Sequence, residues 1–200
     1  MRPSSKEARA ILDAAQHPDD AFSWIEHSFC VGDTAKKLAE ALRQRGEDID
    51  VDLAAALGYL HDIGKMVKHT HSHLLDGYEW LMSRGYTEDF CTIALVHHSI
   101  SNDPFCMIGP PPDPIKDKLI IDCVRRHSFT PEEKLVIFCD SICLYDVMTV
   151  DKRMTDIISR YGTGEKTAER IRQTLAFKAD LDKRLGQNLY DLFPEVKNNL

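Results

Sequence analysis

Hydrophobic residues recur at helical spacing along almost the whole chain. Between residues 20 and 45, the apolar positions Val31, Ala35, Leu38 and Leu42 are separated by four, three and four residues, which places them on one face of a helix. The same spacing predicts a short helix near residues 5–14 and further helices over 50–64, 72–83, 87–98, 130–141, 151–161 and 165–184. The chain is therefore predicted to be all-α.

Polar residues mark where several of these helices begin. Residues 4–7 and 130–133 each form the pattern of a capping box, in which a serine or threonine is followed three residues later by a glutamate. Pro131 suits the first position of a helix. Either Asp50 or Asp52 caps the helix over 50–64.

Two segments depart from the helical pattern. Residues 102–117 contain five prolines, which cannot donate a backbone hydrogen bond inside a helix. This composition predicts one long loop, and long loops in compact domains are often functional. Residues 120–124 are apolar and are interpreted as a possible short strand, although the chain offers it no obvious partner.

The length and composition indicate one globular domain. The chain has 200 residues, of which 43% are hydrophobic and 28% charged. Its apolar stretch over 54–60 is far shorter than the roughly 20 residues that cross a bilayer. The first seven residues lack the apolar run of a secretory signal. A cytoplasmic protein that does not bind membranes is expected.

Charge and cysteine content narrow the possible partners. The formal net charge of −7 opposes binding to duplex nucleic acid, because the overall field repels a polyanion. A small nucleotide is compatible with this charge, since a metal and a few nearby cations can overcome the field. The six cysteines include no Cys-x-x-Cys pair, which predicts reduced thiols. Cys139 and Cys143 fit two core positions better than a metal or redox pair.

Four ionisable side chains lie in strongly apolar surroundings. His61 and Asp62 follow the apolar residues 54–60, and His27 and Asp140 lie on other apolar helices. Simpler explanations exist for each: an exposed helix end, a core histidine and a carboxylate that caps a neighbouring helix. A divalent cation would nevertheless satisfy all four buried groups at once. Helices that each present one polar ligand inside a bundle commonly form metal sites.

The order and spacing of these residues resemble the HD-domain superfamily of metal-dependent phosphohydrolases. The signature reads His-Asp-Ile-Gly-Lys at 61–65, with His27 lying 34 residues before His61 and Asp140 lying 78 residues after Asp62. The resemblance spans residues 20–160. It implies a helical bundle in which these two histidines and two aspartates surround a divalent metal. Residues 161–200 would be a C-terminal helical extension of the single domain over 1–200.

Three further histidines extend the resemblance. His73, His97 and His98 are similar to the additional ligands of the branch that binds two metals bridged by the aspartate of the His-Asp pair. His98 matches the pattern better than His97, but the choice stays open because adjacent helical residues point about 100° apart. The subgroup that the chain most resembles comprises small bacterial hydrolases that split symmetrical dinucleoside tetraphosphates. The sequence around Asp140 and the Pro-rich loop depart from that subgroup.

Other cations and histidines are weaker candidates. Lys65 follows the His-Asp pair and can hold a substrate phosphate, with a solvated lysine as the alternative. Lys68, Arg125 and Arg126 are less favoured for the same role. His69 and His71 are expected in a loop, and His17 and His127 on the surface.

The resemblance implies a metal-dependent phosphohydrolase that acts on a small phosphate ester or anhydride, with a nucleotide as the favoured substrate. Asp62 and Lys65 are the expected catalytic residues. Imidazole and carboxylate ligands suit one or two ions of iron, manganese, cobalt, nickel or zinc. Two other functions fit the same residues: a di-iron oxygenase of the same fold, or a non-catalytic, metal-containing binding module.

Overall fold

The structure, a computed structural model, describes residues 1–15, 23–67, 73–107 and 111–199. Within these ranges every regular element is a helix, and the one β-type contact is an isolated bridge between Cys143 and Val147. The all-α prediction is thereby confirmed. The elements are α1 (Ser5–Asp13), α2 (Trp24–Gln44), α3 (Val51–Leu60), η1 (Ile63–Met66), α4 (His73–Ser83), α5 (Glu88–Cys91), α6 (Ile93–Val96), α7 (Lys118–Arg126), α8 (Pro131–Asp140), α9 (Val150–Tyr161), α10 (Thr167–Leu185), η2 (Leu189–Leu192) and η3 (Pro194–Asn199).

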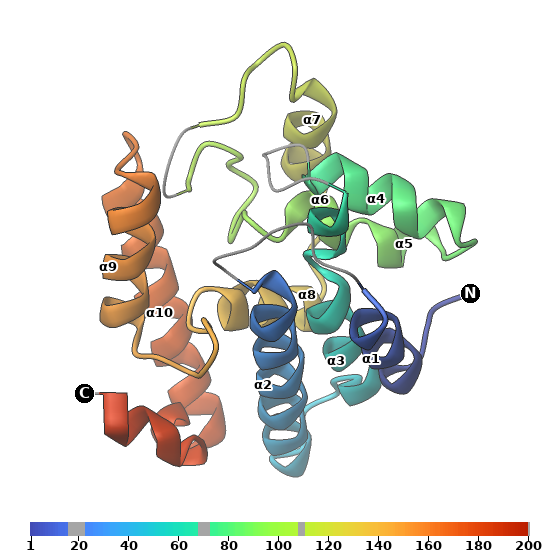
Figure 1. Ribbon diagram of the computed structural model, residues 1–200. Helices are drawn as coiled ribbons and strands as arrows, with labels where there is room; N and C mark the ends of the chain where they lie inside the picture. Colours follow the sequence, from blue (N-terminus) through green and yellow to red (C-terminus); the bar gives the residue numbers. More distant parts are fainter. Residues whose placement is uncertain (16–22, 68–72, 108–110, 200) are drawn as a thin grey trace.

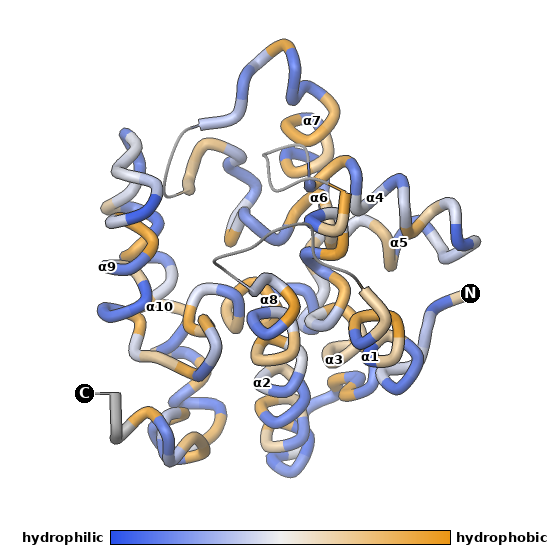
Figure 2. The backbone as a smooth tube through the Cα atoms, viewed as in Figure 1, coloured by the Kyte–Doolittle hydropathy of each residue, from blue (hydrophilic) through white to orange (hydrophobic). Residues whose placement is uncertain are grey.

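Helix α3 is the central element of the bundle. It packs against α1, α2 and α8, and its residues 54–60 are all buried (Figure 1). A helix that is apolar on every side can be stable only when other helices surround it. The longer helix α2 is amphipathic instead, and Figure 2 shows both hydrophobic and hydrophilic residues along it. The four apolar positions of α2 that carried the sequence pattern are all fully buried.

The sequence signals for helix starts are confirmed. Both capping boxes form: the side chain of Ser4 accepts from the backbone of Glu7, and that of Thr130 accepts from the backbone of Glu133. Asp50, rather than Asp52, caps α3 by accepting from the backbone of Leu53. Residues 20–22 and 72, which the predicted second and fourth helices included, lie outside the described residues.

Three expectations about secondary structure are wrong. The strand expected over 120–124 is part of helix α7, because Ile120, Ile121 and Val124 are buried at helical spacing and no partner strand exists among the described residues. The helix expected over 87–98 is divided into α5 and α6 at Thr92. The helix expected over 50–64 ends at Leu60, before the His-Asp pair, and a 3-10 turn follows.

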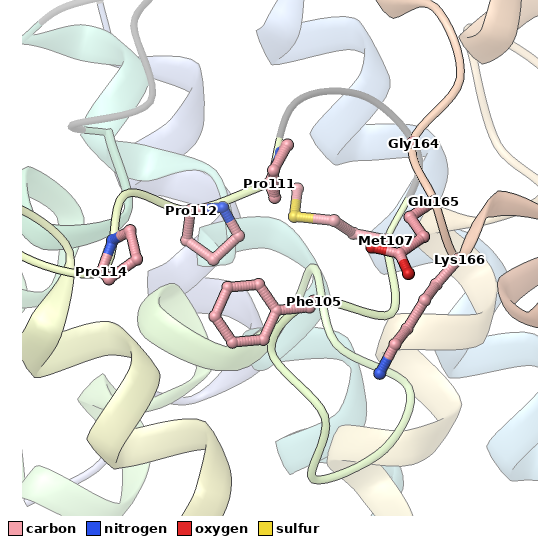
Figure 3. Close-up of a pocket in the computed structure, with 8 residues that line it drawn as sticks. All are labelled: Phe105, Met107, Pro111, Pro112, Pro114, Gly164, Glu165 and Lys166. Atoms are coloured by element: carbon pink, nitrogen blue, oxygen red, sulfur yellow. The ribbon is translucent and has the colours of Figure 1, made fainter.

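The C-terminal helices α9 and α10 lie side by side at the left of Figure 1. The described part of the Pro-rich loop, residues 102–107 and 111–117, contains no helix, as the prolines predict. A cavity of about 360 Å³ lies between this loop and the turn before α10. Figure 3 shows Phe105, Pro112 and Met107 gathered around this space. None of the candidate metal ligands lines it.

Two further expectations concern the cysteines and the membrane. All six cysteines are free thiols, and Cys139 and Cys143 are fully buried in the core. Among the described residues, no helix combines the length and the hydrophobicity needed to cross a bilayer. The division into a core over 20–160 and an extension over 161–200 stays a prediction.

Candidate metal centre

Helices α2 and α8 bring together two of the predicted ligands. His27 lies in the first turn of α2 and is only 2% exposed. Asp140 is the last residue of α8, and its Oδ1 lies 3.0 Å from Nε2 of His27. The two residues are 113 positions apart in the chain, so the packing of α2 against α8 creates this contact.

The His-Asp pair lies where α3 ends. His61 is the C-terminal cap of α3, and its Nδ1 lies 2.7 Å from the carbonyl oxygen of Gly58. A carbonyl oxygen can only accept, so Nδ1 carries the proton and Nε2 presents a lone pair. This Nε2 lies 3.5 Å from Oδ2 of Asp62 and 3.8 Å from Oδ1 of Asp140.

The three remaining histidines meet on the other side of Asp62. His73 begins α4, and His97 and His98 follow α6. Nε2 of His73 and Nε2 of His97 each lie 3.3 Å from Oδ1 of Asp62. The rings of His73 and His98 are 5.2 Å apart. The structure therefore brings both His97 and His98 to the centre, whereas the sequence left a choice between them.

Asp62 divides the cluster into two halves. We call His27, His61 and Asp140 half A, and His73, His97 and His98 half B. In each half, one potential ligand atom from every residue lies within 4.8 Å of the others. Oδ2 of Asp62 faces half A and Oδ1 faces half B, so this carboxylate can contribute to both.

The donor atoms fit divalent cations. Nδ1 of His97 lies 3.2 Å from the carbonyl oxygen of Ile93, which leaves a lone pair on Nε2 that faces the carboxylate of Asp62. Two acceptors at 3.3 Å repel each other unless a cation lies between them. Ligand atoms about 2.0–2.2 Å from a metal are roughly 3–3.4 Å from each other, which agrees with this spacing. Among the described residues, the buried Nε2 of His61 also has no hydrogen-bond partner.

The protonation states of these residues also suit a metal. Burial lowers the pKa of His27 and His61, and it lowers the pKa of His98 well below the ordinary value. Burial alone would raise the pKa of Asp62, but Lys65 and His61 outweigh it and hold the pKa well below the ordinary value. Burial alone would raise the pKa of Asp140 too, but the hydrogen bond with His27 outweighs it and the pKa is held well below the ordinary value. Neutral imidazoles and ionised carboxylates are the forms that bind metals.

Lys65 contacts the centre directly. Its ammonium group donates to Oδ2 of Asp62, and 18% of its side chain is exposed. The 3-10 turn η1 places Lys65 three residues after Asp62, where the two side chains can meet. A freely solvated lysine, the alternative from the sequence, does not agree with this contact.

The structure does not bring the weaker candidates to the centre. Arg125 and Arg126 are exposed at the end of α7, and Arg125 lies over the ring of Phe105. His127 is half-buried, with Nε2 2.9 Å from Glu133, so the expectation of a surface residue is wrong. The other weak candidates, His17, Lys68, His69 and His71, lie outside the described residues.

Two pairs of glycines bring the ligand-bearing helices into close contact. A Cβ atom on Gly58 of α3 would lie 2.7 Å from the Cα atom of Gly32 in α2. A Cβ atom on Gly64 would lie 2.0 Å from the carbonyl oxygen of His73 and 2.4 Å from the backbone nitrogen of Gly77. The first pair brings α2 to α3 beside half A, and the second brings η1 to α4 beside half B. The sequence analysis missed this role, although Gly58 interrupts the otherwise apolar residues 54–60.

Arg170 of α10 also escaped the sequence analysis. Its guanidinium is buried and donates to the hydroxyl of Ser141, the residue after Asp140. The sequence around it is a polar, amphipathic helix in which one more arginine carries no distinguishing signal.

Comparison with known proteins agrees with this geometry. Residues 24–143, more than half of the chain, match the HD domain. The chain belongs to the HD-domain family. An uncharacterized protein of Methanocaldococcus jannaschii is 32% identical to it over 139 residues, which cover 68% of this chain and 74% of the relative. No solved structure matches the chain. HD domains bind divalent metals, and most members of the family are metal-dependent hydrolases.

Proposed function

We propose that this HD domain is a phosphohydrolase with two divalent metal ions, and that its substrate is a small phosphate ester or anhydride, in the first instance a nucleotide. The observation that carries the proposal is the position of Asp62 between two clusters of donor atoms. His27, His61 and Asp140 would hold one ion, and His73, His97 and His98 the other, with Asp62 as a ligand of both.

The protein residues have distinct tasks in this reaction. The two ions, held by the six ligands and Asp62, would supply an acidified water and would bind phosphate oxygens. The backbone carbonyls of Gly58 and Ile93 fix the ring orientation and tautomer of His61 and His97. Once Asp62 serves as a metal ligand, the ammonium group of Lys65 becomes available to a phosphate oxygen of the substrate. The mixed imidazole and carboxylate ligands favour iron, manganese, cobalt, nickel or zinc.

The finer assignment within the family is also a proposal. The His-Asp-Ile-Gly sequence and the number of clustered histidines support kinship with the hydrolases that split symmetrical dinucleoside tetraphosphates. The different sequence around Asp140 and the Pro-rich loop favour another substrate of the same chemical class. A cytoplasmic location and the absence of duplex nucleic acid and membrane partners remain part of the proposal.

The test combines metal analysis with a substrate panel. Protein purified without chelators should contain about two equivalents of transition metal. It should release phosphate from some nucleotides or phosphoesters with Mn²⁺, Co²⁺ or Fe²⁺, and Asp62→Asn should abolish release. Oxygen consumption by the reduced iron protein, without phosphate release, would favour the oxygenase. Metal binding without turnover of either kind would favour the binding module.

Lys65 provides a second test of the proposed mechanism. Replacement of Lys65 by methionine should lower kcat/KM by about tenfold, equivalent to about 1.4 kcal/mol of transition-state stabilisation. The bound metal should be retained, because Lys65 is not one of its ligands. Unchanged kinetics on the best substrate would contradict contact between Lys65 and phosphate.

A further inference from the structure

The C-terminal helix α10 contributes a buried cation next to the candidate centre. Arg170 is 5% exposed and lies in a part of the chain beyond the residues that match the HD domain. Its Nη2 donates to Oγ of Ser141 at 2.9 Å, and Ser141 directly follows Asp140. The hydroxyl of Ser141 in turn donates to the carbonyl oxygen of Ile137. These contacts fix one side of the guanidinium beneath the end of α8.

The other side of the guanidinium lacks a partner. Nη1 of Arg170 is buried and makes no hydrogen bond within the described part of the chain. Ser141 is neutral, and burial raises the pKa of the nearby Cys106 thiol, so this thiol is neutral too. Asp140 is the carboxylate that acts on the charge of Arg170, but its Oδ1 already faces His27 and belongs to half A. Burial lowers the pKa of Arg170, but an arginine still keeps its proton at neutral pH, so a buried positive charge remains with one unsatisfied donor among the described residues.

A fixed positive charge at this place does not help to bind metal. It repels divalent cations and attracts anions. With an ion in each half, the positive charges of the ions, Lys65 and Arg170 would far exceed the negative charges of Asp62 and Asp140. Lys65 of η1 donates to Asp62, and Arg170 of α10 is attracted electrostatically to Asp140. The two cations therefore belong to different elements. Such a centre requires an anionic ligand.

We propose that Arg170 binds a phosphoryl oxygen of the substrate through Nη1, so that helix α10 completes the substrate site of the HD domain. The inference rests on the proposed function only in that the anion is a phosphate at the same centre. The side chain of Asp140 is 18% exposed, so an anion can approach the end of α8 from solvent. Guanidinium groups recognise phosphate oxygens by charge-assisted hydrogen bonds.

The experiment measures binding of inorganic phosphate to the manganese-loaded protein by calorimetry. Arg170→Met and Arg170→Gln should each raise the Kd of phosphate by about tenfold or more, and Arg170→Lys by less. Manganese content should remain that of the wild type. Arg153→Met is the matched control, because Arg153 is equally buried but already donates to the Cys143 carbonyl oxygen and pairs with Asp156. Its phosphate Kd should not change.

Two results would overturn the inference. An unchanged phosphate Kd in the folded Met or Gln variant would leave Arg170 with a packing role. If the variants lose manganese together with phosphate binding, Arg170 positions the metal ligand Asp140 and does not bind phosphate itself. If the methionine variant does not fold, the glutamine variant, which can still donate to Ser141, carries the test. A wild type that binds phosphate through Arg170 but hydrolyses nothing would refute the proposed function and leave the inference intact.

Discussion

The two halves of the candidate centre share Asp62 but differ in charge and in the backbone that holds them. Half A combines two histidines with the carboxylate of Asp140, and its residues lie on α2, on α8 and at the end of α3, whose residues 54–60 are all buried. Half B has three histidines and no carboxylate of its own, and these histidines lie at the first residue of α4 and just after the four-residue helix α6. The halves do not differ in burial, because each has one half-buried member, Asp140 in half A and His98 in half B.

The difference indicates an order of metal affinity. A carboxylate attracts a divalent cation more strongly than a neutral imidazole does, and half A has Asp140 in addition to its share of Asp62. Side chains on helices that pack into the bundle also have less freedom to move than side chains on short turns. We therefore expect half A to bind its ion more tightly than half B, and half B to lose its ion first.

Asp62→Asn should have the largest effect, because it removes the one carboxylate that both halves share. Neither ion should remain after gel filtration, and phosphate release should fall to background. Helicity by circular dichroism should be kept, since the substitution preserves the shape of the side chain. Metal analysis checks the outcome, and full occupancy of both sites in this variant would exclude Asp62 as the shared ligand.

Single ligand substitutions should separate the halves. Asp140→Asn should release the ion of half A and abolish activity, while His98→Ala should remove only the weaker ion of half B. Activity of the His98 variant should fall more than its metal content, because a shared water needs both ions to be acidic at neutral pH. Titration of manganese into the metal-free variants gives the stoichiometry. One equivalent in the wild type, unchanged in the His98 variant, would argue for a single-metal centre.

Gly64→Ala tests how half B is attached to the His-Asp pair. The new methyl group would meet the backbone of His73 and Gly77, so η1 and α4 must separate. The expected loss of stability is about 1–3 kcal/mol, with weaker metal binding in half B than in half A. Gly77→Ala is a graded control, because its Cβ would approach Gly64 only to 3.1 Å. If both variants bind metal as tightly as the wild type, the contact between Gly64 and Gly77 does not support metal binding in half B.

The stability of the metal-free protein should fall on acidification, which is the smallest expected effect. The pKa values of His27, His61 and His98 are lowered in the folded state, so the unfolded chain takes up protons first as the pH falls below about 6.5. The lowered pKa values of Asp62 and Asp140 act in the same direction below about pH 4. Urea unfolding between pH 8 and 5 measures the first window. A stability that rises on acidification would contradict the burial of these histidines.

Much of the fold could be predicted because its signals are local. Capping boxes, apolar spacing and the prolines of the loop each act within a few residues, and they correctly located the starts of α1 and α8 and the loop around residue 111. The segment 120–124 was misinterpreted because a short apolar run has no distinct period. In the folded chain Ile120, Ile121 and Val124 are buried at helical spacing within α7, which shows that the segment is a helix.

The candidate centre was predictable in part for a different reason. Histidines and aspartates in apolar segments are costly without partners, so His27, His61, Asp62 and Asp140 stand out in the sequence. The proximity of both His97 and His98 to His73 depends on how α6 ends beside α4, which no local pattern encodes. Arg170 and the glycine contacts also depend on the packing of segments distant in the chain.

The contact between Lys65 and Asp62 has a consequence for folding of the metal-free protein. The ammonium group supplies a counter-ion for Asp62, which is only 2% exposed, so folding need not wait for metal to bind. A chain that folds first presents a ready receptor, and an incoming ion has only to exchange with a flexible side chain. The ligand set then restricts the choice of ion, and the supply of metal decides among the ions that it accepts. Formation of the active protein would then be limited by the supply of metal and not by folding around it.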